Sequence, residues 1–401
     1  MKIILVFITV LTIYLALNKE KKNATFSASP LSLVVTSNIV VLVFYYITSD
    51  FLGFHSLSFD TFVVLLYGCI FFAIVSLLYS SNITVKTSSN SNRELHFVEV
   101  YPNKMIVVLA FITIAFMGLK IQTLGLNNIF EDDDSAMLFG ASGLSGHILV
   151  LQVLLATHLI GRKLTLLSSI AVLGLVFCLF VYNVKAWVII PFLLGFFIRK
   201  DLLGMKINLI AIFFAVLGIF VLFTISYLIQ LGWDFEHMDF IWAHFCKYIF
   251  AGIGGLNEAL TQRYPIGNAP FYGTPTFVSL ILPVKIIVPS EYDYVIINDL
   301  NGEYTNVYSL FGGAYLFNGP VIGGIYLLLL AVISNVLYRK SQRTDNYWFC
   351  LSYYMWSSGL ILSFFSNYYT LLNIWELTAV AFLIGLYYQR RRPQQITQEV
   401  K

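Results

Sequence analysis

The stretch TFVVLLYGCIFFAIVSLLYS, residues 61–80, decides the fold, because it contains no charged side chain. An α-helix of about 20 apolar residues crosses the roughly 30 Å hydrocarbon core of a bilayer and pairs its backbone amides within the segment. Similar stretches recur along all 401 residues, of which 58% are hydrophobic and only 11% are charged. An ordinary soluble domain has about 25% charged residues. The sequence therefore predicts an all-α, polytopic integral membrane protein.

The apolar stretches predict about eleven transmembrane helices. They cover residues 2–17, 30–49, 61–80, 104–121, 144–161, 164–182, 184–199, 207–229, 314–338, 346–365 and 371–388. No linker, low-complexity tract or repeat separates them, so we expect a single transmembrane domain over residues 1–401. The first stretch lacks a strong basic lead and a small-residue cleavage site, and lysines follow it. We therefore expect a retained helix there rather than a signal peptide.

Lysine and arginine residues gather in every second gap between the predicted helices, and the other gaps hold few of the 24 such residues. The positive-inside rule places the basic gaps in the cytoplasm. The N-terminus is then outside and the C-terminus inside, which requires an odd number of helices. The net charge of +3 follows from the same bias. We expect no nucleic-acid partner, because no basic run is interleaved with stacking aromatic residues.

The longest loop, residues 230–313, is predicted on the outer face, and a loop of this length without a function is uncommon. Apolar residues at helical spacing from Phe240 to Ile249, with Gly252 at the end, predict a helix that lies at the membrane surface. The apolar stretch 276–289 is too short to span, so we expect a re-entrant or interfacial segment. Residues 263–273 are rich in Pro, Gly and Tyr, which favours rings that stack on sugars or, alternatively, a packed lid without a ligand.

The predicted outer face holds few cations, and three of them are candidates for binding an anionic ligand. Arg263 comes first, because a planar guanidinium suits phosphate oxygens; the alternative is an ion pair with Glu258. Lys185, in the short turn between the sixth and seventh helices, is expected to bind an anionic headgroup or to extend to the interface. Lys247 lies in the predicted surface helix.

Polar residues also crowd the chain just before the glycine-rich ninth helix. Tyr304, Thr305, Asn306 and Tyr308 predict a cavity rim with substrate-binding side chains, and an N-cap at Thr305 or Asn306 is the alternative. Glu376 lies one turn inside the last predicted helix. An intramembrane carboxylate is a candidate site residue by default, and a structural hydrogen bond is its alternative interpretation.

No pattern of metal ligands or disulfides defines a cofactor site in the sequence. His237 and His244 have carboxylates nearby, but no third ligand has standard spacing, so a role as a base is the better interpretation. The acidic run 131–134 is expected to be a solvated loop, and the four cysteines form no disulfide framework. We expect no metal and no other cofactor.

Two short motifs carry a resemblance to a known family. One is Thr305-Asn306-Val307-Tyr308-Ser309, followed by Tyr315, Gly319, Gly323-Gly324 and a helix that ends at Arg339-Lys340; the other is the turn Asn183-Val184-Lys185-Ala186-Trp187, followed by Pro191. The chain resembles the bacterial oligosaccharide repeat unit polymerases, the Wzy-type O-antigen and capsular polysaccharide polymerases. Its length, topology and single large outer loop are similar to theirs. It departs from the Arg-to-Gly spacing of some members, because only nine residues separate Arg263 from Gly273.

The resemblance implies an inverting glycosyltransferase at the periplasmic face of the bacterial inner membrane. It would transfer a growing glycan from undecaprenyl diphosphate to the non-reducing end of a new lipid-linked repeat unit. The implied partners are undecaprenyl-diphosphate-linked oligosaccharides, membrane lipid, and a chain-length regulator and a flippase of the same pathway. No metal or cofactor is implied.

This reaction needs cations beside the leaving diphosphate and a base beside the acceptor hydroxyl. Arg263 and Lys185 are the expected cations, and Glu258, Glu303 and His244 are the candidates for the base, in that order. A flippase or transporter of lipid-linked oligosaccharide is the main alternative, although such a protein is expected to have charges along a central path and internal repeats. An O-antigen ligase is a second alternative. A membrane O-acyltransferase fits less well, because the first predicted helices lack a His, Arg or Asp set.

Overall fold

The structure is a computed structural model of the whole chain. It describes residues 2–22, 29–80, 104–131, 133–140, 143–182, 185–203, 217–218, 220–221, 223–225, 227–229, 231–269, 295–298, 302–344 and 346–399. Contacts within the chain divide it into two compact units. The first unit comprises Met1–Ser89, Trp242–Arg343 and Trp356–Trp375, and the second unit comprises Asn90–Ile241, Thr344–Met355 and Glu376–Lys401.

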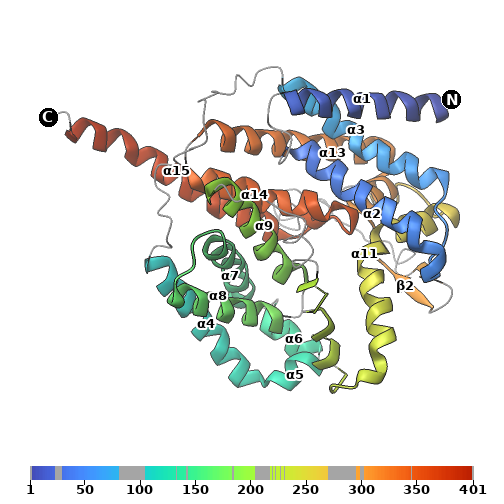
Figure 1. Cartoon of the computed structure of the whole chain (residues 1–401). Helices are drawn as coiled ribbons and strands as arrows, with labels where there is room; N and C mark the ends of the chain where they lie inside the picture. Colours follow the sequence, from blue (N-terminus) through green and yellow to red (C-terminus); the bar gives the residue numbers. More distant parts are fainter. Residues whose placement is uncertain are drawn as a thin grey trace. The chain divides into compact units, whose positions relative to one another are not determined.

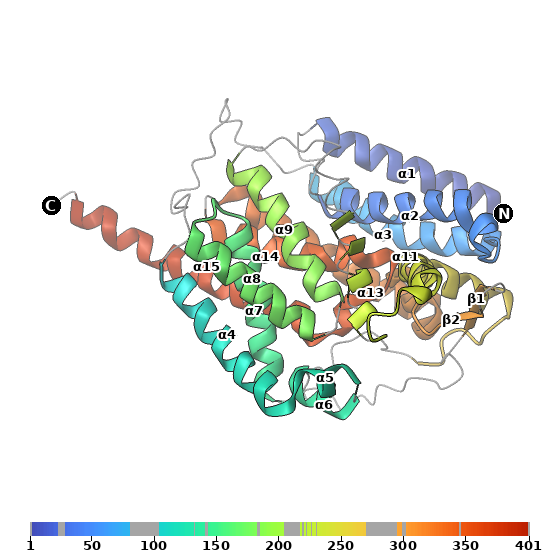
Figure 2. The same ribbon diagram turned by 60° about the horizontal axis from the view of Figure 1, so that its bottom comes forward.

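The first unit is built from long apolar helices around α3. Its helices are α1 (Lys2–Lys22), α2 (Pro30–Leu52), α3 (Phe59–Ser80), most of α11 (Met238–Thr261) and α13 (Leu310–Arg343). Helix α3 packs against α1, α2 and α13, and these helices run side by side in Figures 1 and 2. A Cβ on Gly68 would overlap the ring of Phe311, so glycine is what lets α3 approach α13 closely.

Helix α13 is kinked near its middle. Gly319 has a left-handed φ of 73° and Pro320 follows it, so the regular backbone hydrogen bonding is interrupted there. The helix begins after Ser309, whose hydroxyl accepts a hydrogen bond of 3.0 Å from the backbone N–H of Gly312. The alternative of an N-cap at Thr305 or Asn306 is therefore wrong, since Ser309 occupies that position.

A short antiparallel hairpin lies in the long segment before α13, and the sequence pattern did not predict it. Strand β1 (Val295–Asn298) pairs with β2 (Glu303–Thr305), with Val295 opposite Thr305. An irregularity of register between Ile296 and Asn298 bends the pair. The backbone of Asn298 also pairs with Phe54, which connects the hairpin to the turn between α2 and α3.

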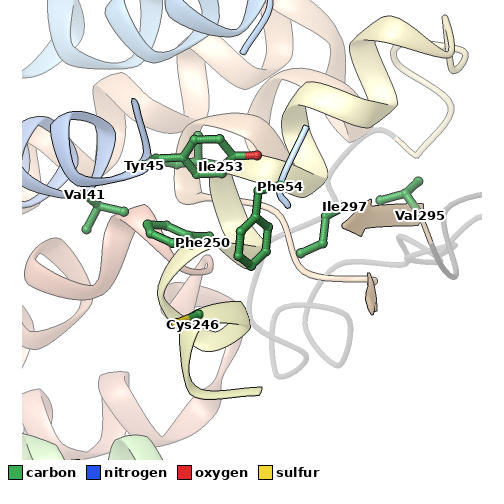
Figure 3. Close-up of a cluster of buried hydrophobic side chains, with 8 residues drawn as sticks. All are labelled: Val41, Tyr45, Phe54, Cys246, Phe250, Ile253, Val295 and Ile297. Carbon is green, nitrogen blue, oxygen red and sulfur yellow. The ribbon is translucent and has the colours of Figure 1, made fainter. Parts of the chain in front are cut away.

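A cluster of buried side chains joins α2, α11 and β1 in the first unit (Figure 3). Phe250 is its centre, with its ring centroid 5.0 Å from that of Tyr45 and 5.1 Å from that of Phe54. Val295 and Ile297 of β1 complete the cluster together with Val41, Cys246 and Ile253. Burial raises the pKa of the Cys246 thiol to about 11, so this cysteine is a packing residue rather than a reactive thiol. The cluster fixes the hairpin on α11.

The second unit includes the helices shown in cyan to green in Figure 1. It contains α4 (Lys104–Leu124), α5 (Leu126–Glu131), α6 (Asp133–Gly140), α7 (Leu144–Ile160), α8 (Leu166–Val181), α9 (Lys185–Leu203) and the 3₁₀ turn η2 (Phe235–His237). Helix α7 packs against α8 and α9, and α4 packs against α8. Glycines at positions 161 and 195 allow the close approach of α7 and α9.

The last helices of the chain each have residues in both units. Helix α14 (Tyr347–Ile361) begins in the second unit and ends in the first, where the 3₁₀ turns η4 (Leu362–Phe364) and η5 (Tyr368–Thr370) follow. Helix α15 (Leu372–Glu399) begins in the first unit and lies mostly in the second.

The structure confirms a mostly helical fold with apolar helices. Every predicted span except the eighth coincides with a helix, and the eighth, 207–229, falls mostly outside the described residues. Among the described residues, α2, Phe59–Tyr79, α4 and α13 are long and apolar enough to cross a membrane, and three shorter helices, Leu144–Ile160, Leu166–Val181 and Ala186–Arg199, are also apolar. These helices support a protein embedded in a membrane. The total of eleven spans and their orientation stay predictions.

The predicted end of the loop helix at Gly252 is wrong, because α11 continues to Thr261. Gly252, Gly254 and Gly255 lie at close contacts between α11 and its neighbours, where any side chain would meet another backbone or side chain. Tertiary packing therefore keeps these glycines helical despite their low helix propensity. The predicted re-entrant segment, 276–289, lies outside the described residues.

Candidate functional site

Three side chains that the sequence singled out meet between α11 and β2. His244 and Lys247 are three residues apart on α11 and therefore share one face of the helix. The carboxylate of Glu303 lies between them: Oε2 is 2.9 Å from Lys247 Nζ, and Oε1 is 3.6 Å from His244 Nδ1. All three side chains are mostly buried, with exposed fractions of 17% for Lys247, 18% for His244 and 9% for Glu303. We call these three residues the Lys247 cluster.

An exposed aromatic ring borders the Lys247 cluster. Side chains alternate along β2, so Glu303 and Thr305 point into the first unit and Tyr304 points outward. The Tyr304 side chain is about half exposed, and Lys247 Nζ lies 4.9 Å from the centroid of its ring. An ammonium group at this distance is attracted to the face of the ring. The arrangement joins a cation, a carboxylate and an imidazole to an exposed ring of the type on which sugars stack.

Other residues of the predicted rim divide between surface and interior. Asn306 is exposed. Thr305 is buried and its hydroxyl accepts a hydrogen bond of 3.0 Å from the N–H of Val307. Tyr308 is also buried, with its ring centroid 5.5 Å from that of Phe317. Tyr304 and Asn306 are therefore placed where a ligand can reach them, whereas Thr305 and Tyr308 contribute to packing.

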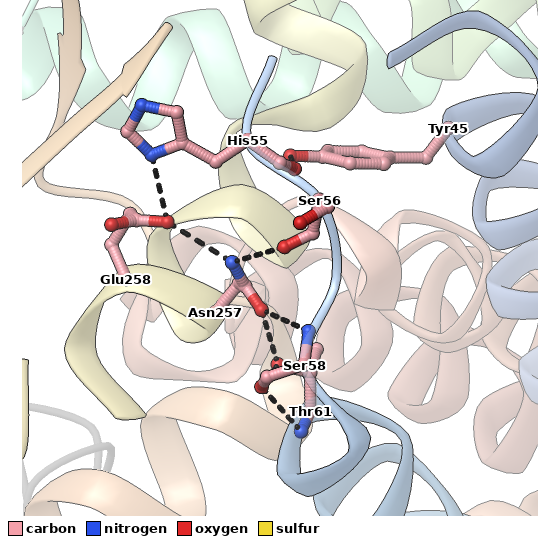
Figure 4. A network of polar contacts seen from close by, with 7 residues as sticks. All are labelled: Tyr45, His55, Ser56, Ser58, Thr61, Asn257 and Glu258. Carbon is pink, nitrogen blue, oxygen red and sulfur yellow. Dashed lines mark hydrogen bonds and ion pairs between the residues drawn. The ribbon is translucent and has the colours of Figure 1, made fainter. Parts of the chain in front are cut away.

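Glu258, the first candidate for the base, takes part in a second polar network on α11 (Figure 4). Its Oε1 lies 2.9 Å from His55 Nδ1 and accepts a hydrogen bond of 3.0 Å from Asn257 Nδ2. Glu258 is 6% exposed. The suggested ion pair with Arg263 is replaced by these contacts, which hold α11 against the connection between α2 and α3. Catalysis by Glu258 stays a prediction.

His55 is part of this network and was missed by the sequence reasoning. Its backbone is held on two sides, because its N–H donates to Ile297 O at 3.2 Å and its carbonyl accepts from the Tyr45 hydroxyl at 2.8 Å. The available signal was a histidine in a short turn between two predicted helices. Its partner Glu258 lies some 200 residues later in the sequence, and no local pattern links the two.

Arg263 follows the end of α11 in an unusual backbone conformation. Its φ is 57°, in the left-handed region that only a few per cent of non-glycine residues occupy. Its side chain is exposed. The N–H of Arg263 donates to Leu260 O at 3.2 Å and the N–H of Tyr264 donates to Ala259 O at 2.9 Å, so this conformation is the left-handed cap that ends α11. Because its side chain is exposed, Arg263 stays a candidate for binding an anion at the surface of the first unit.

The remaining two candidates belong to the second unit. Lys185 is the first residue of α9. Glu376, near the start of α15, has its Oε1 2.7 Å from His147 Nδ1 of α7. The sequence reasoning overlooked His147, which is 57% exposed. The hydrogen bond supports the structural interpretation of Glu376 and connects the ends of two helices. Within the residues that the structure describes, no three His, Cys, Asp or Glu side chains gather as a metal-binding group.

Comparison with known proteins places the chain in a family, but the function of that family is unknown. The model of a family of unknown function, DUF6337, matches residues 53–394. The match spans most of the chain and includes every candidate residue named above. No curated protein matches the chain, and no solved structure does.

Proposed function

We propose that this chain, which belongs to the DUF6337 family of unknown function, polymerises undecaprenyl-diphosphate-linked oligosaccharide repeat units into O-antigen or capsular polysaccharide. It would act as an inverting glycosyltransferase in the bacterial inner membrane, with residues 230–313 at the periplasmic face. The growing glycan is transferred from one lipid carrier to the non-reducing end of a new repeat unit, and undecaprenyl diphosphate is released.

The Lys247 cluster beside Tyr304 is the observation that carries this proposal. A lipid-linked sugar has a polar ring and a charged diphosphate, and the first unit offers an exposed aromatic ring within 4.9 Å of an ammonium group. The carboxylate and imidazole beside that ammonium group supply candidates for a base. These residues lie in a membrane protein whose apolar helices provide a surface for the prenyl chains.

The transfer needs a cation beside the leaving diphosphate and a base beside the acceptor hydroxyl. The leaving diphosphate gains a negative charge as the bond to the sugar breaks, and Lys247 is suited to neutralise it. The acceptor hydroxyl loses its proton, which Glu303 or His244 can take. Holding two lipid-anchored substrates in line supplies much of the remaining rate enhancement.

The charge pattern supports the proposed location. The basic gaps predict a cytoplasmic C-terminus and a periplasmic N-terminus, which puts residues 230–313 on the side where lipid-linked repeat units are joined. A flippase would deliver the repeat units to that side, and a chain-length regulator would limit the product. Both are partners in this proposal.

The surface glycan of a deletion strain tests the function itself. A polymerase deletion leaves a single repeat unit on each surface glycolipid, whereas deletion of a flippase or a ligase leaves none. A deletion strain with normal chain lengths, or with no repeat unit at all, would contradict the proposal.

Arg263 and Lys185 variants test the predicted phosphate-binding residues. We expect Arg263→Ala and Lys185→Ala each to lower polymerisation on the order of 100-fold, because a charge that binds an anionic group of a substrate is lost. Arg263→Gly relieves the left-handed backbone, so its loss of polymer would report the side chain rather than misfolding. Lys120→Ala removes another predicted outer cation as a control. Normal glycan lengths in both the Arg263 and the Lys185 variants would show that neither residue binds the substrate.

A further inference from the structure

The Glu303 carboxylate is the least exposed member of the Lys247 cluster, and it has a lysine and a histidine beside it. Glu303 Oε2 contacts Lys247 at 2.9 Å, while the 3.6 Å to His244 Nδ1 exceeds the length of a good hydrogen bond. Lys247 is therefore the main charged partner of the mostly buried Glu303 carboxylate. A ligand that binds the ammonium group of Lys247 in place of Glu303 therefore removes the main charged partner of this carboxylate.

A diphosphate is a ligand that can compete with the Glu303 carboxylate for the ammonium group of Lys247. It offers more negative charge and more acceptor oxygens than one carboxylate, and a lysine ammonium on a flexible four-carbon stem can turn toward it. Lys247 Nζ lies 4.9 Å from the centroid of the Tyr304 ring, so the ammonium group is next to a half-exposed side chain. A sugar on that ring would have its diphosphate within the reach of Lys247.

We propose that Lys247 exchanges partners during the reaction: the donor diphosphate replaces Glu303 as its counter-ion, and the released Glu303 then acts as the base for the acceptor hydroxyl. This inference rests on the proposed polymerase function and assigns its two main roles. Once Lys247 has turned away, its position at 2.9 Å from Glu303 Oε2 is vacant, and that oxygen can accept the proton of the acceptor hydroxyl. Glu303 thus becomes available as the base only after the donor has bound.

The atoms and charges of the step balance. The O–H bond of the acceptor hydroxyl breaks and its proton goes to a Glu303 carboxylate oxygen. A bond forms between the acceptor oxygen and the anomeric carbon of the donor sugar. The bond from that carbon to the diphosphate oxygen breaks, and its electron pair leaves with undecaprenyl diphosphate, whose new charge faces Lys247. After the product leaves, Glu303 loses its proton to water and pairs with Lys247 again.

The geometry favours Glu303 over Glu258 for this role. Glu258 is 6% exposed and accepts hydrogen bonds within a network that joins α11 to the connection between α2 and α3. Glu258 and Lys247 are also eleven residues apart on one helix, about 16 Å along its axis. A base must lie within about 3 Å of the proton it removes, beside the sugar that the diphosphate carries.

Binding of undecaprenyl diphosphate by the purified full chain in lipid nanodiscs is the first measurement. We expect Lys247→Met to weaken binding by at least about tenfold, because it keeps the stem and removes the charge. We expect Glu303→Gln to bind as tightly as the unchanged protein or more tightly, because the competing carboxylate is gone. Inorganic pyrophosphate as a competitor distinguishes a site for any diphosphate from one that also needs the prenyl chain.

Polymer formation from lipid-linked repeat units by the same samples is the second measurement. Glu303→Gln is expected to lower turnover on the order of 100-fold or more while binding is retained. Asp239→Asn is the matched control, since it makes the same change from carboxylate to amide at an exposed position of α11. Unchanged turnover in Glu303→Gln, or unchanged binding in Lys247→Met, would overturn the proposal.

A charge-exchange variant separates this role from a structural ion pair. Lys247→Glu combined with Glu303→Lys restores the pair with its charges reversed, and a purely structural pair would then regain activity. We expect this double variant to fold and to stay inactive; recovery of polymer would contradict the proposal. If the unchanged protein binds undecaprenyl diphosphate but forms no polymer, the polymerase function fails and the diphosphate site at Lys247 stands.

Discussion

At the scale of single residues, Asn257 shows how one buried amide joins α11 to the chain between α2 and α3. The amide is 2% exposed and makes four hydrogen bonds. Its Oδ1 accepts from Ser58 N at 2.7 Å and from Thr61 Oγ1 at 2.9 Å; its Nδ2 donates to Ser56 O at 3.1 Å and to Glu258 Oε1 at 3.0 Å. These partners come from α11, from the connection between α2 and α3, and from the first turn of α3 (Figure 4).

Asn257→Ala is therefore expected to destabilise the protein by about 3 kcal/mol, because several buried polar groups lose their partner at once. Thermal unfolding of the detergent-solubilised protein measures the change. Asn306→Ala is the control, since Asn306 is exposed on the same long segment and should leave the midpoint unchanged. Equal midpoints for the two variants would show that the network does not hold α11 in place.

At the scale of elements, the fit between α11 and the hairpin depends on one of two adjacent glycines. A Cβ on Gly255 would overlap the carbonyl oxygen of Val307 and lie 3.0 Å from Thr305 Cγ2, whereas a Cβ on Gly254 would lie 3.3 Å from Ile297 Cγ2. The first contact involves backbone, which cannot turn aside. The second involves the end of a side chain, which can move by a few tenths of an ångström.

We expect alanine to be tolerated at position 254 and to destabilise the protein at position 255. Alanine in place of glycine within a helix gains about 1 kcal/mol of helix propensity, so Gly254→Ala should be near neutral. Gly255→Ala should displace β2, separate Glu303 from Lys247, and lower both polymer formation and the unfolding temperature. The two variants form their own control, because they differ by one position on one helix. A harmless Gly255→Ala would mean that the hairpin does not need this contact.

At the scale of the whole molecule, the orientation in the membrane is the property that the proposed function most needs. Lysine and arginine in every second gap predict the C-terminus in the cytoplasm and residues 230–313 in the periplasm. A fluorescent protein fused at the C-terminus should therefore fluoresce, and an alkaline phosphatase fused within 230–313 should be active, because that enzyme folds only in the oxidising periplasm. The reverse pattern would place the Lys247 cluster on the wrong side for this reaction.

The sequence by itself determined the helical, membrane-embedded character of the chain and most helix positions. This was possible because a helix in lipid satisfies its backbone hydrogen bonds within one segment, so about 20 consecutive residues carry the signal. The stretch 61–80 is the clearest case, and α3 covers Phe59–Ser80. The sequence also identified Lys247, Glu303 and His244 one by one, from their residue types and their place in the long loop.

Only the tertiary structure decided which of these residues meet. Lys247 pairs with Glu303 across a hairpin that alternation of residues did not reveal, since β1 and β2 have only a few residues each. His147 and Glu376 are separated by 229 positions, and no local pattern could join them. The extension of α11 past Gly252 was equally hidden, because the contacts that need glycine there come from distant segments. Which side chains meet depends on how helices that are distant in the sequence pack together. The energy of that packing comes from contacts between segments, so no single segment of the sequence reveals it.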